Sequence, residues 1–456
     1  MQALRRICTA FWLTALPLAA GPLHAAGQEL TPDEMRAAAA AMVQSGRTET
    51  ALGMTQALLG RDPDDVQALL IRSRALRDSG DTGGARDAAR RVLALADGDR
   101  ALVHAASLAM AQAWSTDGHR TLAQVWLRRA AENAPDEAAR AQAERDYRYV
   151  RSRNRWSTRL AFSVAPKSNV NNGSVHDSAQ LYGLPFQLAL PGATQALSGL
   201  EIAGGGTLRY RMAETRTRAT DFVIAGWHQT YVLSDAAKAK APGSKGSDFA
   251  TTTLSLGLDH RFLLENGRSE VSLGARAGRH WLGGSHYGDF VRGTTGLRYR
   301  LDPARSMTVG LSAERTGGPR APHATAIEVT ASFSQQVQTG LVQLSIGAMD
   351  SSSSIDVADY RQIKLGLDYV HGRPVLGTEL RAGIDWRLRD YPVSSFAPGQ
   401  GREDTEVSGY VDVAFPQVDY YGFNPTVTVR ASRQDSSVGL FDIDRLGVQL
   451  GFRSAF

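Results

Sequence analysis

A strict alternation of apolar and polar residues over nine or more positions constrains this chain more than any other feature. From 254 to 262 one face would carry Leu254, Leu256, Leu258, His260 and Phe262, and the other would carry Ser, Gly, Asp and Arg. Side chains of a β-strand point alternately to two faces, so this pattern predicts a strand with one apolar and one polar face. The same alternation recurs at 380–389 and at 446–453.

The length of these segments separates two kinds of β-protein. Strands of soluble sandwiches are mostly about 5–6 residues long, whereas strands that cross a bilayer need about 9–11 residues. Membrane-spanning strands place apolar residues toward lipid and polar residues toward the lumen. Rows of Arg, Asp and Gly on the polar face need a lumen wider than that of a barrel of about eight strands. Residues 155–456 are therefore expected to form an antiparallel outer-membrane β-barrel.

Alternation and turn residues together give a strand count. They predict fourteen strands, with an error of two either way, and an even count is typical of single-chain bacterial barrels. Long loops are expected at 166–198, 234–248 and 391–403. The strands are expected near residues 157, 200, 217, 250, 270, 290, 306, 325, 341, 360, 377, 405, 425 and 444.

The polar face of one predicted strand is unusually rich in charge. Arg381, Asp385, Arg387 and Arg389 alternate with apolar residues between 380 and 389. We consider them candidate lumen residues. Two interpretations stay open: they contact a substrate in the lumen, or they form charge pairs that only fill and brace it.

The preceding residues, 27–154, have a different period. Apolar positions recur at helical spacing, and three positions repeat along the chain at intervals of 34 and 38 residues. Each unit has a glycine, an alanine five residues later, and a proline or aspartate seventeen residues after the glycine. The units are Gly46, Ala51, Pro63; Gly80, Ala85, Asp97; and Gly118, Ala123, Pro135.

This spacing resembles the tetratricopeptide repeat, in which glycine lies in the turn between two helices, a small residue lets the helices approach, and proline ends the second helix. A plain helical bundle is the alternative, because the aromatic positions of that repeat are mostly Ala or aliphatic here. Repeat arrays of this kind form concave surfaces for peptides or partner proteins. The fold class is thus α + β multidomain, with an all-α repeat domain before the barrel.

Residues 1–26 have the pattern of a secretory signal peptide. Arg5 and Arg6 precede an apolar stretch at 10–20, and small residues at Ala25 and Ala26 offer a cleavage site. A membrane anchor is disfavoured because the apolar run is short and interrupted by prolines. The chain's one cysteine, Cys8, lies before that run. The mature protein is therefore expected to contain no thiol, no disulfide and no cysteine-bound metal.

Charge and histidine spacing exclude several function classes. The net charge is +5 with 46 Arg and 5 Lys, but acidic and basic residues are balanced in both parts of the chain, so nucleic acid is not an expected partner. The barrel histidines lack metal-ligand spacing, and the segment from His286 to Asp289 matches no catalytic motif. We predict no enzyme activity, no catalytic residue, no metal site and no cofactor.

Three segments together resemble one known family. Pro166, Asn169, Asn171 and Asn172 follow the first predicted strand as Pro-x-x-Asn-x-Asn-Asn. The last part of the chain adds Arg402, Asp404, Gly422, Phe423, Pro425 and the final Phe456. Each segment alone is weak, because an Asn-rich segment is usually only a turn. In this order they resemble the surface lipoprotein assembly modifier (Slam) family, over nearly the whole mature chain.

The resemblance implies a fourteen-stranded outer-membrane barrel with a periplasmic tetratricopeptide domain. Such a protein would move lipoproteins, or related soluble proteins, from the periplasm to the cell surface. The implied partners are the exported protein, a periplasmic chaperone, the barrel assembly machinery and outer-membrane lipid. The alternative is an exopolysaccharide export pore, since some such exporters also join helical repeats to a barrel. Four aromatic residues in 28–154 are few for stacking sugar rings.

Phe456 gives a first test. An aromatic residue at the end of an alternating last strand resembles the sorting signal of bacterial outer-membrane proteins. Deleting Phe456 should therefore slow assembly without changing the finished barrel. Pulse-chase labelling that follows the heat-modifiable folded form measures this, and normal rate and yield in the truncated protein would contradict the interpretation.

Overall fold

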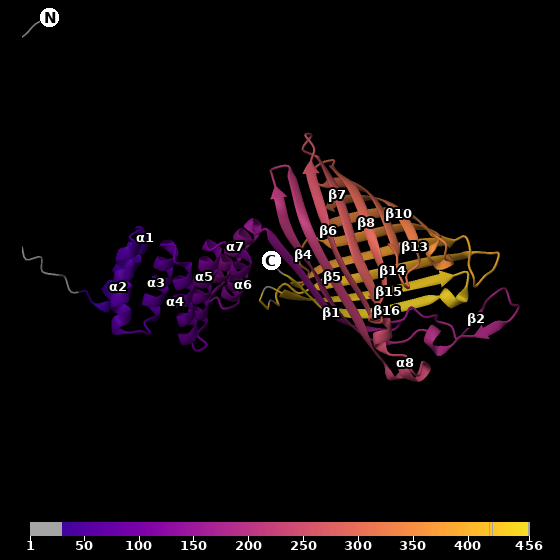
Figure 1. Ribbon diagram of the computed structural model, residues 1–456, viewed down its shortest axis with the longest axis horizontal. Coiled ribbons are helices and arrows are strands. Elements are labelled where there is room, and N and C mark those ends of the chain that lie inside the picture. Colours follow the sequence, from indigo (N-terminus) through magenta and orange to yellow (C-terminus); the bar gives the residue numbers. More distant parts are fainter. Residues whose placement is uncertain (1–29, 419, 422, 455–456) are drawn as a thin grey trace, which may run out of the picture. The chain divides into compact units, whose positions relative to one another are not determined.

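The computed structural model describes residues 30–418, 420–421 and 423–454. The predicted signal peptide, Gly422 and Phe456 lie outside these ranges. The chain divides into two compact units, Met1–Ala88 and Ala89–Phe456, and each is described by itself. Helices precede strands along the chain (Figure 1), which confirms the predicted fold class.

The described part of the first unit contains α1 (Pro32–Gln44), α2 (Thr48–Arg61), α3 (Val66–Asp78) and the first half of α4 (Thr82–Leu95). Gly46 and Gly80 have φ of +75° and +94°, a conformation that costs glycine little, and each follows the first helix of a pair. Ala51 and Ala85 are fully buried. The two glycines thus lie in turns between successive helices, and the two alanines are buried positions of α2 and α4.

The second unit continues with α5 (Arg100–Thr116), α6 (Arg120–Glu132) and α7 (Glu137–Arg153). Gly118 has φ of +82° in the turn between α5 and α6. The core of these three helices consists of Ala111, Ala123, Leu127, Tyr147 and Val150, with Leu108, Trp114 and Trp126 packed against it. Two residues separate the end of α7 from the start of strand β1 (Trp156–Lys167), and the period of the sequence changes at the same place.

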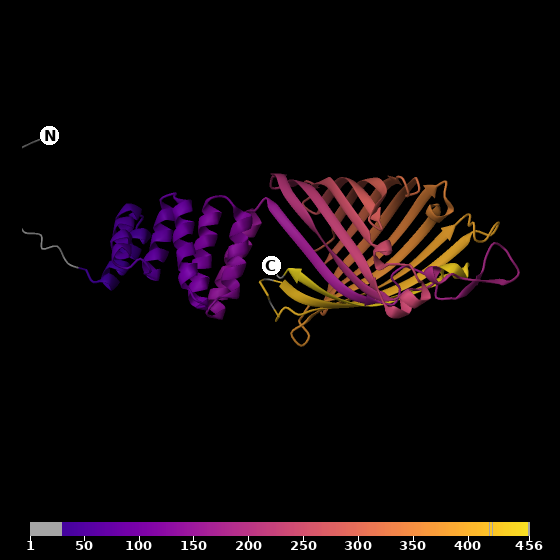
Figure 2. The ribbon, with the colours of Figure 1, turned by 60° about the horizontal axis from the view of Figure 1, so that its bottom comes forward.

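Fourteen antiparallel strands form a closed barrel within the described ranges, which confirms the predicted count. Each strand pairs with its neighbours in sequence, and β1 pairs with β16 to close the wall (Figure 2). Two short strands, β2 (Ser178–Gln180) and β3 (Gln187–Ala189), form a separate hairpin between β1 and β4. The other barrel strands are β4 (Gly199–Glu214), β5 (Arg218–Leu233), β6 (Thr251–Leu263), β7 (Ser269–Leu282), β8 (Ser285–Arg300), β9 (Arg305–Gly317), β10 (Ala324–Val337), β11 (Gly340–Ser353), β12 (Tyr360–His371), β13 (Glu379–Tyr391), β14 (Arg402–Ala414), β15 (Phe423–Ser436) and β16 (Ile443–Ser454).

The two ends of the barrel differ. One end, called the loop end below, carries the long connections 168–198, 234–250 and 392–401, which agree with the predicted loops. The short helix α8 (Asp235–Lys240) and strand β2 lie at this end (Figure 1). The other end, called the turn end, carries short turns such as 215–217 and 338–339. Strand β1 starts and β16 finishes at the turn end.

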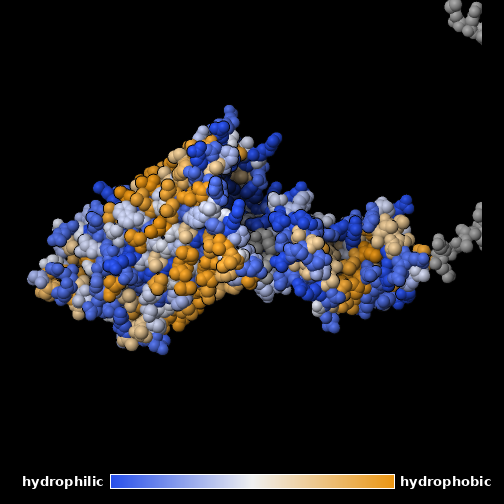
Figure 3. Space-filling model, turned by 180° about the vertical axis from the view of Figure 1, so that it is seen from behind, coloured by the Kyte–Doolittle hydropathy of each residue, from blue (hydrophilic) through white to orange (hydrophobic). Residues whose placement is uncertain are grey.

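The outer face of the barrel is apolar. Leu256, Leu344 and Leu450 are 52–57% exposed, and most of the exposed large hydrophobic side chains belong to barrel strands (Figure 3). In water such a surface would aggregate, but facing lipid it is the expected surface of a membrane-spanning barrel. No helix in the described part of the chain is long and apolar enough to cross a membrane.

The inner face holds charges that neutralise one another. The Asp221 side chain on β5 is fully buried and accepts hydrogen bonds from Arg209, at 2.9 Å, and from Arg211. Arg261 on β6 approaches the same carboxylate to 3.6 Å. A buried carboxylate is stable only when it is paired, so Asp221 joins strands β4, β5 and β6 through its arginines.

Asp221→Asn should destabilise the barrel, because it removes the buried negative charge that Arg209, Arg211 and Arg261 share. Breaking a buried ion pair costs about 3–5 kcal/mol, and partial exposure of Arg209 and Arg261 to lumen water lowers the expected loss to about 2–3 kcal/mol. Guanidinium unfolding in lipid vesicles measures this loss. Asp235→Asn on the fully exposed start of α8 is the matched control, and equal stability of the two variants would contradict the prediction.

Candidate functional site

Most of the motif residues gather at the loop end, where three asparagines follow β1 directly. Asn169 is buried, and its side-chain amide donates to the carbonyl oxygens of Gly173 at 2.8 Å and Asp444 at 3.3 Å. Its side-chain oxygen accepts from the N–H of Gly173 at 3.0 Å. Asn169 thus closes a turn in the 168–198 loop and connects that turn to the start of β16.

Asn171 joins the two ends of the 168–198 loop. Its amide donates to the carbonyl oxygens of Ala193 at 3.0 Å and Gln195 at 2.9 Å, and its oxygen accepts from the N–H of Leu197 at 3.0 Å. Asn172 has φ of +53°, a left-handed conformation that Asn tolerates better than most residues, and accepts a 2.7 Å hydrogen bond from Arg445. The sequence indicated only a turn. The structure shows that these asparagines also form hydrogen bonds between segments that are distant in the sequence.

Further hydrogen bonds join residues 168–176 to residues 439–446, and together with those of Asn169 and Asn172 we call them the latch. The N–H of Ser168 donates to Leu446, and the N–H of Leu446 donates back to the Ser168 hydroxyl, at 3.0 and 2.8 Å. The imidazole of His176 lies 2.8 Å from the Asp442 carboxylate. The latch therefore continues the β1–β16 contact beyond the strands at the loop end.

Arg402 and Asp404 form a second buried cluster at the same end. The guanidinium carbon of Arg402 lies 3.7 Å from the ring centre of Tyr391 and 3.8 Å from that of Phe441, a double cation–π contact. Arg402 also pairs with Asp404 at 3.1 Å. Asp404 in turn accepts a 2.6 Å hydrogen bond from the Ser436 hydroxyl. These contacts fix the loop ends of β14 and β15.

Apolar residues pack these loops against one another. The cluster contains Ala179, Leu181, Leu190 and Val438, with Leu188, Phe396, Ala397, Leu440 and Phe441 around it. Loop 168–198 thus contacts loops 392–401 and 437–442. Beside this cluster is a polar recess of about 550 Å³, lined partly by His176, Gln180, Gln187, Gln400 and Ser437.

The remaining motif residues that the structure describes, Phe423 and Pro425, lie at the other end of the barrel. Phe423 and Pro425 begin β15 at the turn end, and between them Asn424 donates to the carbonyl oxygens of Pro416 at 3.3 Å and Val418 at 3.0 Å. Asn424 thereby closes the turn between β14 and β15. The motif residues consequently occupy two separate structural positions and form no single reactive centre.

The four lumen candidates share one face of β13. Asp385 pairs with Lys364 at 3.1 Å, and Arg387 pairs with Glu406 at 2.7 Å. Arg389 donates to the Gln362 side chain at 2.8 Å. The sequence analysis missed these partners, although β12 and β14 place them on the same polar face by alternation. The pairing agrees with the bracing interpretation, and substrate contact stays a prediction.

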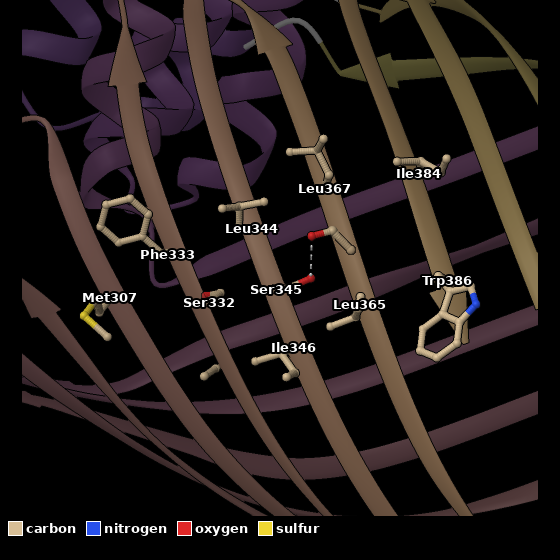
Figure 4. A pocket seen from close by; sticks show the side chains of 12 residues that line it. Met307, Ser332, Phe333, Leu344, Ser345, Ile346, Leu365, Leu367, Ile384 and Trp386 are labelled. Atoms are coloured by element: carbon tan, nitrogen blue, oxygen red, sulfur yellow. Dashed lines mark hydrogen bonds between the residues drawn. The ribbon is translucent and has the colours of Figure 1, made fainter. Parts of the chain in front are cut away.

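A shallow recess of about 530 Å³ lies on the opposite, apolar face of the same strands (Figure 4). Its lining includes Phe333 on β10, Ile346 on β11 and Trp386 on β13. In a bilayer, lipid chains would fill such a recess, because it belongs to the apolar outer face. It offers little polar chemistry for orienting a soluble ligand.

No protein-family model matches the chain, and no curated protein matches it. Among solved structures, OccK7 (OpdD) of Pseudomonas aeruginosa is similar at 12% identity and a TM-score of 0.33, with 66% of this chain and 98% of that one covered. A bacterial polysaccharide outer membrane secretin is similar at 7% identity and a TM-score of 0.32, covering 65% and 98%. The Yersinia enterocolitica type III secretion translocator chaperone SycD is 17% identical with a TM-score of 0.24, covering 27% and 88%. These likenesses name no family and no substrate for this chain.

Asn171→Ala should loosen the 168–198 loop, because the loop loses three hydrogen bonds that join its ends. This loss exceeds about 1.4 kcal/mol, so local opening should increase at least about tenfold. Chymotrypsin cleavage within 168–198, measured on the folded protein in vesicles, reports the opening. Asn266→Ala in turn 264–268 is the control, and equal cleavage rates in the two variants would contradict the role of Asn171.

Proposed function

We propose that this protein is an outer-membrane translocator that exports lipoproteins, or related soluble proteins, to the cell surface. The observation that carries the proposal is a closed barrel with a charged lumen, joined through two residues to a helical array. Short turns of bacterial barrels face the periplasm and long loops face outside. By this rule the end of the barrel with the short turns faces the periplasm. The helical array is connected to β1 at that end, and a substrate would arrive from the periplasm. The motif resemblance to the Slam family supports the same proposal.

The lumen wall suits a polypeptide in transit. A bilayer core costs several kcal/mol for each backbone group that lacks a hydrogen-bond partner, so an unfolded substrate needs polar partners throughout its path. The charged rows of β4–β7 and β12–β16 offer such partners, because their arginines and carboxylates are partly exposed to the lumen. The barrel would shelter a polypeptide, and the helical array would recognise it or a chaperone that delivers it.

The helical part argues against the polysaccharide alternative. Sugar export systems stack sugar rings on exposed aromatic side chains. Here Tyr147 is buried, and Trp114 and Trp126 are packed against the core of α5–α7. Tyr149 is exposed, but the guanidinium of Arg153 lies over its ring at 4.1 Å. The helices therefore provide no row of free aromatic rings in their described residues.

A lipid anchor places a further demand on any such exporter. Each CH₂ group taken from lipid into water costs about 0.8 kcal/mol, so an acyl chain is strongly disfavoured in a charged, wet lumen. The polypeptide of a lipoprotein can pass through the lumen, but moving its acyl chains into the lumen would cost much free energy.

Deleting residues 28–150 tests the division of labour. The barrel should still insert, because its strands pair only with one another, but export should fall because recognition is lost. Protease shaving of intact cells measures surface exposure of a lipoprotein encoded beside this chain, with total lipoprotein as the control. Undiminished exposure would mean that the barrel recognises its cargo alone. Unchanged exposure after deletion of the whole chain would remove the translocator proposal and favour the polysaccharide pore.

A further inference from the structure

Among the described residues, the contact between β1 and β16, called the seam below, has the fewest register pairs in the barrel wall. Four described pairs join these strands: Phe162–Phe452, Ser163–Gly451, Val164–Leu450 and Lys167–Gly447. Each of the other thirteen interfaces has ten to fifteen such pairs. Ala165 and Pro166 interrupt the ladder, since neither pairs with β16. The seam therefore has fewer backbone hydrogen bonds to lose than any other part of the wall.

The residues along the seam explain this weakness. Pro166 has no N–H to donate, and proline is confined to places where a ladder can spare a donor. Gly447 and Gly451 on β16 present no side chain to β1, and glycine weakens a strand interior. On the lumen face, Ser163 and Ala165 are also small. Both are buried, so they expose little surface to the lumen.

Charge pairing, which joins strands elsewhere, does not cross this seam. Ion pairs link β4 to β5 through Arg209 and Asp221, β8 to β9 through Arg292 and Glu314, and β13 to β14 through Arg387 and Glu406. Within the described parts of β1 and β16, no ion pair joins the two strands. Lys167 of β1 pairs instead with Glu201 of β4, and Arg453 of β16 pairs with Glu379 of β13.

Only the loop end of the seam is strongly fastened. The latch holds residues 168–176 to residues 439–446 by side-chain and backbone hydrogen bonds, including those of Asn169, Asn172 and His176. The strands below the latch carry only the interrupted ladder. The seam thus combines a firm closure at the loop end with a weak wall toward the turn end.

We propose that the β1–β16 seam is the lateral path for the acyl chains of a lipidated substrate, while the polypeptide occupies the lumen. This inference rests on the proposed export of lipoproteins. Acyl chains are recognised by lipid-like surroundings, and the outer face beside the seam supplies them through Leu160, Phe162 and Leu450, each more than half exposed. When β1 and β16 separate, the lipid anchor can stay in the bilayer while the attached polypeptide crosses through the lumen.

A disulfide across the seam tests this directly. A Cβ atom built on Gly451 would lie 3.9 Å from the Cβ of Ser163, within the range of about 3.5–4.5 Å that a disulfide needs. The variant is Ser163→Cys with Gly451→Cys. The matched control is Ser408→Cys with Ser432→Cys, a facing pair on the lumen side of β14 and β15. The chain's one cysteine, Cys8, belongs to the predicted signal peptide, so each mature double variant is expected to carry only the two introduced cysteines.

The bonds are formed by mild oxidation after the barrels have assembled in intact cells, and heat modifiability verifies that both variants are folded. Oxidised S163C/G451C should lower surface exposure of a lipidated cargo at least about tenfold, because the anchor would have to enter the wet lumen. Reduction should restore exposure, and oxidised S408C/S432C should match wild type. The same cargo with its lipidated cysteine replaced should still pass through the locked barrel.

Undiminished exposure of the lipidated cargo through the locked barrel would overturn the inference. Equal loss of lipidated and unlipidated cargo would also overturn it, because the seam would then serve the polypeptide. A strain that lacks the whole chain separates this failure from failure of the proposed function. If exposure survives that deletion, the export proposal fails and the seam inference fails with it. If exposure is lost in the deletion strain but is normal in oxidised S163C/G451C, only the seam inference fails.

Discussion

The requirement that every backbone N–H and C=O in a bilayer finds a partner determines the architecture of residues 156–454. Helices satisfy that requirement internally, and strands satisfy it only when the sheet closes on itself. The alternation of leucine with small and charged residues selects the strand solution, because it exposes one apolar face to lipid and turns the other inward. Closure by β1 and β16 is then obligatory, and among the described residues it depends on the shortest ladder in the wall.

Charged residues inside the barrel follow from the same closure. A lumen lined by fourteen strands is too wide for apolar side chains to fill, so long charged side chains line the wall and pair with those of nearby strands. Asp221 shows the principle, since its three arginines come from the two strands that flank β5, two from β4 and one from β6, and it is fully buried among them. The same pairing recurs at β12–β14 with Lys364, Asp385 and Glu406. The inner face therefore stabilises the wall and offers hydrogen-bonding groups to a passing chain.

Features set by local sequence could be predicted, and features set by distant contacts could not. Strand number, the helix–strand boundary and the glycine turns at Gly46, Gly80 and Gly118 depend on periodicity or on a single backbone conformation. The roles of Asn169 and Asn171 depend on acceptors such as Asp444 and Ala193, which only the folded barrel brings near. Likewise, nothing in the residues of β13 alone indicates Lys364 or Glu406 as partners. Alternation shows which face a residue takes but not which neighbour it meets.

Closure of the barrel and the proposed passage of a lipid anchor place opposite demands on one wall. A ladder of ten or more pairs at every interface would keep lipid out of the lumen. It would also prevent a lipid anchor from passing the wall to the cell surface. A seam with Pro166 and two glycines lowers the cost of parting at one place without weakening the other interfaces. The latch keeps that seam shut at the loop end, and Asn169, Asn172 and Arg445 supply part of it. The described hydrogen bonds of the asparagines that follow β1 all go to other parts of the chain, so the role that the structure shows for them is to stabilise the closure.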